Sequence, residues 1–93
     1  MADIQDLQPP NSAWIPANGG DINYALLQLK SDGPVLVQIA ARDPGPTNVE
    51  GIVLMRGELE ELPLPGIEPG DILYLRSLQD EDNNVAVYTT NSA

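Results

Sequence analysis

Proline and glycine occur so often in this chain that they limit every regular element to a short segment. The 93 residues include nine prolines and eight glycines. Proline ends or kinks a helix, and both residues favour turns. The apolar runs between these breaks are short and rich in valine, isoleucine and leucine, which is typical of strands. The pattern predicts an all-β domain: a small β-sandwich or partly open barrel of six to seven short antiparallel strands.

Two apolar runs, Ile52–Met55 and Ile72–Leu75, are the clearest strand candidates. Each is bounded by glycine and is too short for a free-standing helix, so both are predicted to be buried strands. The segment between them is punctuated by proline and glycine. Within it, residues 58–64 fit either one helical turn or a strand that divides its leucines between two faces, and both alternatives stay open.

Two hairpins are predicted from neighbouring strand candidates. The first joins residues 22–30 to residues 34–42 through a three-residue loop that ends in glycine. The second joins residues 72–77 to residues 84–90. Alternation places one set of apolar side chains on a single face of each strand. Residues 22–29 also suit a short helix, because alanine, leucine and glutamine favour helices, but the β-rich partner segment favours a strand.

The first twelve residues are polar and end near two consecutive prolines, Pro9 and Pro10. They are predicted to form an extended, flexible N-terminal arm, and residues 13–93 a single β domain. An alternative is an arm that orders on a neighbouring subunit, with Ile4 and Leu7 as its anchors.

The charge of the chain is strongly negative, which bears on its partners. Fourteen acidic residues against four basic ones give a formal net charge of -10. Such a chain repels phosphate backbones and lacks a basic face for anionic lipids, so neither a nucleic acid nor a membrane is an expected partner. Cysteine and histidine are absent from the sequence. Disulfides and the usual zinc or copper sites are therefore not expected, and no cofactor is predicted.

The remaining polar residues do not form a recognisable catalytic pattern. Ser31 has only Lys30 beside it, which gives the hydroxyl no sensible activating base. The acidic loop at residues 80–84 is the best metal candidate, yet it lacks the spacing of a calcium loop and is interpreted as a solvated hairpin tip. The glutamates within residues 58–61 are interpreted as a solvated edge. The sequence therefore predicts a protein that is not an enzyme.

The order of strands and turns resembles that of small tailed-phage virion proteins, which are β-sandwich proteins of capsids, tails and fibres. The resemblance covers about residues 14–90 and consists of Trp14, Gly33-Pro34-Val35-Leu36-Val37, Pro46 to Leu54, Gly70-Asp71-Ile72-Leu73-Tyr74-Leu75-Arg76-Ser77, and Val85-Ala86-Val87-Tyr88. It is a pattern of strands and turns, and it carries no catalytic residues.

This resemblance implies a structural role in a virion, most simply as a homotrimeric capsid decoration or cement protein made in the host cytoplasm. The implied partner is the major capsid protein or another virion protein. The alternative is a tail or fibre module that binds a host-surface glycan or protein, which would require Trp14 or the tyrosines in an exposed groove. The predicted interface residues are Ile4, Leu7, Trp14, Leu59, Leu62, Arg56 and Arg76.

Overall fold

The computed structural model describes residues 2–11, 13–18, 22–41, 45–78 and 83–90, which form eight strands. In chain order these are β1 (Ala2–Leu7), β2 (Ile15–Pro16), β3 (Tyr24–Leu29), β4 (Val35–Ala41), β5 (Ile52–Leu54), β6 (Glu61–Pro65), β7 (Asp71–Ser77) and β8 (Val85–Thr90). Across these ranges no helix has the length and apolar character needed to cross a membrane.

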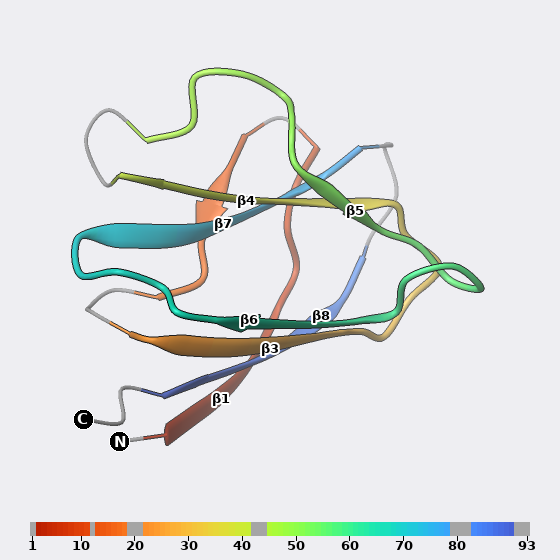
Figure 1. Ribbon diagram of the computed structural model, residues 1–93. Coiled ribbons are helices and arrows are strands. Elements are labelled where there is room, and N and C mark those ends of the chain that lie inside the picture. The colour runs from red at the N-terminus through yellow and green to blue at the C-terminus, as the bar shows by residue number, and fades with distance from the viewer. Residues whose placement is uncertain (1, 12, 19–21, 42–44, 79–82, 91–93) are drawn as a thin grey trace.

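The strands form two antiparallel sheets that stack face to face (Figure 1). The first sheet has the order β1-β8-β3-β6, and the second has the order β2-β7-β4-β5. The two sheets do not close into a barrel, so the predicted all-β fold is confirmed in its sandwich form. The described residues hold eight strands where six to seven were predicted, because the short strand β2 and the N-terminal strand β1 also pair.

The core lies between the two sheets and is aliphatic. Alternation along each strand directs every second side chain inward, as expected for a sheet with one buried face. The inward residues of β3 and β8 in the first sheet meet those of β4 and β7 in the second. The central strands contribute Ala25, Leu27, Leu29, Val35, Val37, Leu73, Leu75, Val85 and Val87 to this core.

Both predicted hairpins are wrong, although the strands themselves exist. β3 lies in the first sheet and β4 in the second, and β7 and β8 are likewise divided between the sheets. Instead β3 pairs with β8, and β4 pairs with β7. The reason is that each strand has one strongly apolar face. A connection that crosses the sandwich lets these faces cover each other, whereas a hairpin would leave them side by side.

The region around β5 and β6 also differs from the prediction. Ile52 and Val53 are 43% and 42% exposed, so β5 is a partly exposed edge strand and only Leu54 is buried. Residues 61–65 form the strand β6, which decides the open alternative for this segment in favour of a strand. An isolated bridge between Met55 and Leu59 precedes it. The break in pairing between the bridge and β6 lets Leu59 and Leu62 both pack against the core.

The N-terminal segment belongs to the sandwich. The prediction placed residues 1–12 outside the β domain, yet residues 2–7 form β1, which pairs with β8 over six residue pairs. Leu7 packs against the core, and the Gln5 Nε2 donates a hydrogen bond to the Ala17 carbonyl oxygen. These contacts explain why a polar segment with few apolar residues is held at the sheet edge.

A buried polar cluster joins the ends of several connections. Asn83 is 2% exposed, and its Oδ1 accepts hydrogen bonds from Ser31 Oγ at 2.6 Å and from the Gly33 N–H at 2.9 Å. Its Nδ2 donates to Ser77 Oγ, which in turn donates to the Pro9 carbonyl oxygen at 2.6 Å. The cluster therefore joins the connection between β3 and β4, the end of β7, the residues just before β8 and the segment that follows β1.

Candidate functional site

The outer face of the first sheet carries an apolar row that crosses all four strands. The strand register places Ile4 of β1 beside Tyr88 of β8, Tyr88 beside Leu26 of β3, and Leu26 beside Pro63 of β6. Ile4 is 71% exposed, Pro63 is exposed, and Tyr88 and Leu26 are half-buried. This row, Ile4–Tyr88–Leu26–Pro63, is named the apolar row below.

Neighbouring side chains extend the apolar row on one side and bound it with polar groups on the other. Tyr24 packs edge-on against Tyr88, with ring centroids 6.3 Å apart and an interplanar angle of 69°, a favourable geometry for two aromatic rings. On the other side, the register forms a second row of Asp6, Ala86, Gln28 and Glu61. Both edges of that second row are acidic, so the apolar row lies beside negative charge.

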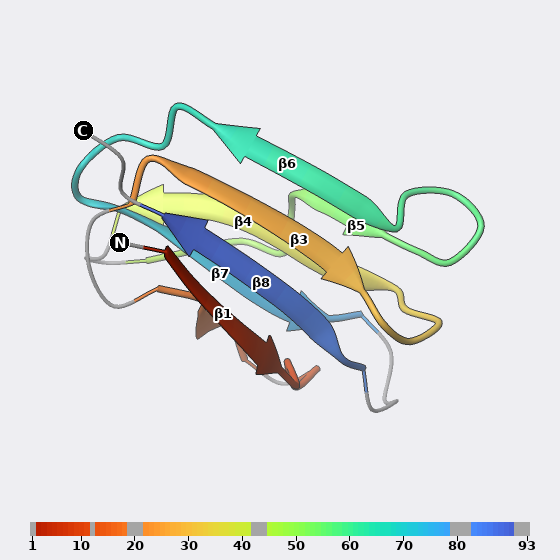
Figure 2. The same cartoon turned by 90° about the horizontal axis from the view of Figure 1, so that it is seen from below.

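No segment of the described chain covers this face. Figure 2 views the sandwich from this side and shows β6, β3, β8 and β1 in front, with the second sheet behind them. Lys30 Nζ forms an ion pair with Asp6 Oδ1 at 3.3 Å near the end of the face. Both side chains are more than half exposed, so the pair adds little to stability. A contiguous apolar patch of this kind on an open sheet is typical of an interaction surface.

The outer face of the second sheet is different, because the chain itself covers the part around β4, while Val53 of the edge strand β5 stays 42% exposed. Figure 1 shows the connection between β4 and β5 passing over the outer side of β4. Leu36 and Ile72 belong to this outer face by alternation, yet each is only 3% exposed. Trp14 is half-buried, and its Nε1 donates to the Asn48 carbonyl oxygen at 3.2 Å. Trp14 and the connection thus contact each other above the sheet.

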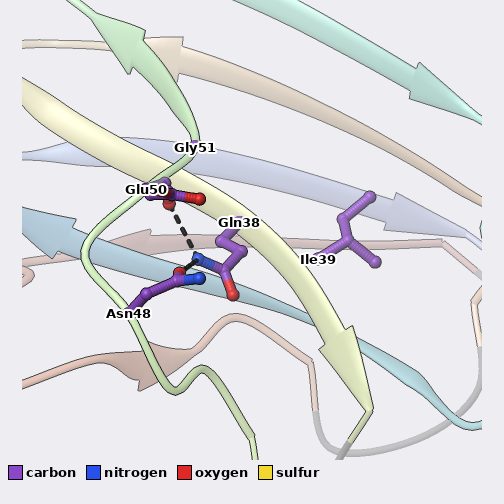
Figure 3. Close-up of a pocket in the computed structure, with 5 residues that line it drawn as sticks. All are labelled: Gln38, Ile39, Asn48, Glu50 and Gly51. Atoms are coloured by element: carbon purple, nitrogen blue, oxygen red, sulfur yellow. Dashed lines mark hydrogen bonds between the residues drawn. The ribbon is translucent and has the colours of Figure 1, made fainter.

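A shallow hollow of about 300 Å³ lies where this connection meets β4 (Figure 3). Gln38, Ile39, Asn48, Glu50 and Gly51 line it. The Gln38 Nε2 donates to Asn48 Oδ1 at 2.9 Å and to the Glu50 carbonyl oxygen at 2.8 Å, so these polar groups hold the connection in place. Among the described residues, the hollow offers one carboxylate and no second acid or base for proton transfer. None of the aromatic side chains lines it.

The predicted interface residues are distributed over several parts of the molecule. Ile4 is strongly exposed on the apolar row, whereas Leu7, Leu59 and Leu62 turn inward against the core. Trp14 lies over the second sheet. The two arginines are used within the chain: Arg56 Nε forms a 3.3 Å ion pair with Asp32, and Arg76 Nε donates to the Asn11 carbonyl oxygen at 3.0 Å. The structure therefore does not gather these seven residues into one surface.

Sequence reasoning missed most of the apolar row. Alternation separated Leu26 from Leu27 and Tyr88 from Val87 without showing which face is the core, and the structure places Leu27 and Val87 in the core. Finding the row also required the knowledge that β3 pairs with β8, and this pairing joins segments about sixty residues apart in the sequence. The hairpin interpretation assigned each strand to the wrong neighbour.

Among the described residues no group of three or more acidic, histidine or cysteine side chains could hold a metal ion. Of the acidic loop considered above, residues 80–82 lie outside the described part, and Asn83 belongs to the buried cluster. Comparison of the chain with known proteins gives no matching family model, no matching curated protein and no matching solved structure.

Proposed function

We propose that this chain is a non-enzymatic structural protein of a tailed-phage virion, acting as a capsid decoration or cement protein. In this proposal its outward-facing first sheet contacts the major capsid protein or another virion protein. The succession of strands and turns along residues 14–90, which resembles that of small tailed-phage virion proteins, supports the virion assignment. The proposal for the contact surface depends on one observation, the apolar row on an uncovered sheet face.

The composition of that face indicates what the partner surface should offer. The apolar row supplies aliphatic and aromatic groups whose removal from water would favour association. Asp6 and Glu61 lie beside it at opposite edges of the sheet. A complementary partner would therefore present an apolar centre with basic groups at its rim. These basic groups would orient the two proteins and raise their rate of association.

The first experiment asks whether the protein is part of the particle. Virions would be washed at high ionic strength and analysed by mass spectrometry, and particles that lack the protein would be heated beside complete ones. We expect the protein to remain in washed virions, and particles without it to lose their genome at a lower temperature. Absence from washed virions would refute the proposal.

The second experiment asks whether the apolar row makes the contact. Leu26→Glu places a charge at the centre of the row, and we expect it to weaken binding to depleted particles at least about 10-fold. Val53→Glu is the matched control, because Val53 is 42% exposed and lies on the other sheet. Thermal unfolding of both variants checks that they fold. Equal loss of binding in both would contradict the assignment of the contact to the first sheet.

A second candidate is a tail or fibre module that binds a host-surface glycan. The observation that favours it is the Tyr24–Tyr88 pair on the open face, because aromatic rings form stacking surfaces for sugars. A glycan array with the chain, repeated with Tyr88→Ala, tests this candidate. Binding that the substitution abolishes would support it, and an array without any bound glycan would eliminate it.

A further inference from the structure

The two edges of the first sheet differ in their capacity to pair with another strand. At the β6 edge, the Leu29 N–H donates to the Glu60 carbonyl oxygen at 2.7 Å. Antiparallel partners alternate between hydrogen-bonded and non-hydrogen-bonded pairs. With the β3–β6 register, Leu62 and Leu64 direct their backbone groups toward β3, and residues 61, 63 and 65 direct theirs outward.

Two of those three outward positions on β6 are proline. Pro63 and Pro65 have no N–H to donate, so a strand that approached this edge would lose two hydrogen bonds of the ladder. Proline at an edge is a common means of preventing strand addition. The β6 edge is therefore protected against a further strand.

The β1 edge has no such protection. The Lys30 N–H donates to the Asn84 carbonyl oxygen at 2.8 Å, which fixes the alternation between β3 and β8. It follows that residues 85, 87 and 89 of β8 direct their backbone groups toward β1. Through the β1–β8 register, residues 3, 5 and 7 bond to β8, and Ala2, Ile4 and Asp6 direct their N–H and C=O groups to the open edge. None of these three is proline.

We propose that two copies of this chain associate through the β1 edge by antiparallel pairing about a two-fold axis at Ile4. In this register Ile4 lies opposite Ile4 of the second copy. Ala2 of each copy lies opposite Asp6 of the other. It is the register in which every outward N–H and C=O of β1 finds a partner. The two four-stranded sheets become one sheet of eight strands.

The side chains along β1 also fit this register and a second copy of the chain as the partner. Ile4 is 71% exposed in the single chain, and in the pair it contacts an identical side chain, so the apolar row continues into the second copy as one row of eight residues. Asp6 lies opposite alanine, so it faces no carboxylate, and Lys30 of its own chain already pairs with it at 3.3 Å. Because the β6 edge is blocked, the association closes at two copies.

This inference rests on the edge of the sheet and not on the proposed virion role, so either can fail alone. The primary test is sedimentation equilibrium of the full chain from about 1 µM to about 1 mM, which covers micromolar to millimolar dissociation constants. We expect the mean mass to rise from 10.0 kDa toward twice that value. A mass of one copy over the whole range, or of three copies, would overturn the proposal.

Two substitutions at one position separate backbone pairing from side-chain contact. Ile4→Pro removes an outward N–H and keeps the bonds to β8, so it should raise the dimer dissociation constant at least about 10-fold. Ile4→Thr keeps the N–H and loses apolar area, and it should raise the constant less than Ile4→Pro does. Equal effects of the two variants would show that backbone pairing does not hold the dimer. Thermal unfolding of each variant checks that β1 still docks on β8.

A cross-link provides a measurement that does not depend on the proline variant. The chain has no cysteine, so Ile4→Cys introduces a single thiol. Opposed residues of a hydrogen-bonded antiparallel pair have Cα atoms about 5.5 Å apart, which is within reach of a disulfide. Mild oxidation should give a covalent dimer of Ile4→Cys at low concentration, and Val53→Cys should give far less. Equal cross-linking of the two variants would contradict the register.

Salt dependence distinguishes a second copy from a basic partner strand at this edge. Each chain has a net charge of -10, so repulsion between two copies is screened as salt rises and the dimer should become tighter between about 20 mM and about 0.5 M salt. Binding of a basic strand should become weaker over the same range. Self-association that weakens with salt would contradict the pairing of two acidic copies.

Discussion

The two outer faces of this sandwich differ in what covers them. On the second sheet, the connection between β4 and β5 and the half-buried Trp14 contact each other, and Leu36 on the outer side of β4 is only 3% exposed. On the first sheet, no described segment crosses the apolar row (Figure 2). A chain of this size can therefore cover part of one outer face with its own loops and leave the other open.

The polar groups over the second sheet maintain the fold, whereas the apolar groups of the first sheet remain for a partner. The polar side chains over the second sheet bond to the chain itself, as Gln38 does to Asn48 and Glu50. The apolar groups of the first sheet have no such cover, although exposing them to water carries a cost. The edges show the same contrast, since prolines protect β6 and β1 lacks them.

The largest effect is expected from opening the protected edge. The double substitution Pro63→Thr and Pro65→Thr restores two outward N–H groups on β6, so that both edges of the first sheet can accept a strand. Association should then continue beyond two copies into long assemblies, which light scattering would detect. Glu61→Thr is the control, because residue 61 already directs its N–H outward. A double variant that sediments like the unmodified chain would contradict the role of the prolines.

A smaller effect, on stability, is expected where the connection that covers part of the second sheet ends and β5 begins. Gly51 has φ +146°, and a Cβ at this position would overlap the Val37 carbonyl oxygen. Gly51→Ala should therefore lower the free energy of unfolding by about 3 kcal/mol. Gly57→Ala is the control, with φ +85° and no atom within 4 Å of the added Cβ, and it should cost about 1 kcal/mol. Urea unfolding followed by Trp14 fluorescence measures the free energy of unfolding of both variants. Equal losses of stability would mean that the close approach of Gly51 to the Val37 carbonyl oxygen is unimportant.

The smallest effect concerns the hydrogen bond that connects Trp14 to the cover. Trp14→Phe keeps a ring over the second sheet and removes the donor to the Asn48 carbonyl oxygen, at an expected cost of about 1 kcal/mol. Tyr88→Phe changes a ring on the uncovered face and should alter stability by less than about 0.5 kcal/mol. Circular dichroism of thermal unfolding compares the two. A greater loss for Tyr88→Phe would reverse the contrast between the faces.

The strands could be predicted from the sequence because their signals are local. Apolar runs, alternation and the turn residues around them lie within ten residues of one another, so Val35 and Val37 were placed on one face and Leu36 on the other. The pairing of strands was not local. Nothing in the local pattern indicates that β3 passes its neighbour β4 and pairs with β8, because the choice depends on which faces cover each other across the core.

The candidate surface was only partly accessible to sequence reasoning for the same reason. Ile4 was singled out as an apolar residue in a polar segment, and it is the most exposed of the large apolar side chains in the described residues. Leu26, Tyr88 and Pro63 look unremarkable in the sequence, since each is one apolar residue among many. Their meaning appears only when register places them beside Ile4 in one row.

The sequence alone determined that this protein is built from short strands with an aliphatic core, because proline and glycine interrupt the chain and alternation sorts side chains by face. Only the tertiary structure decided which strands are neighbours, which outer face is covered and which edge is open. These properties arise from contacts between residues far apart in the chain, and such contacts depend on the packing of whole faces.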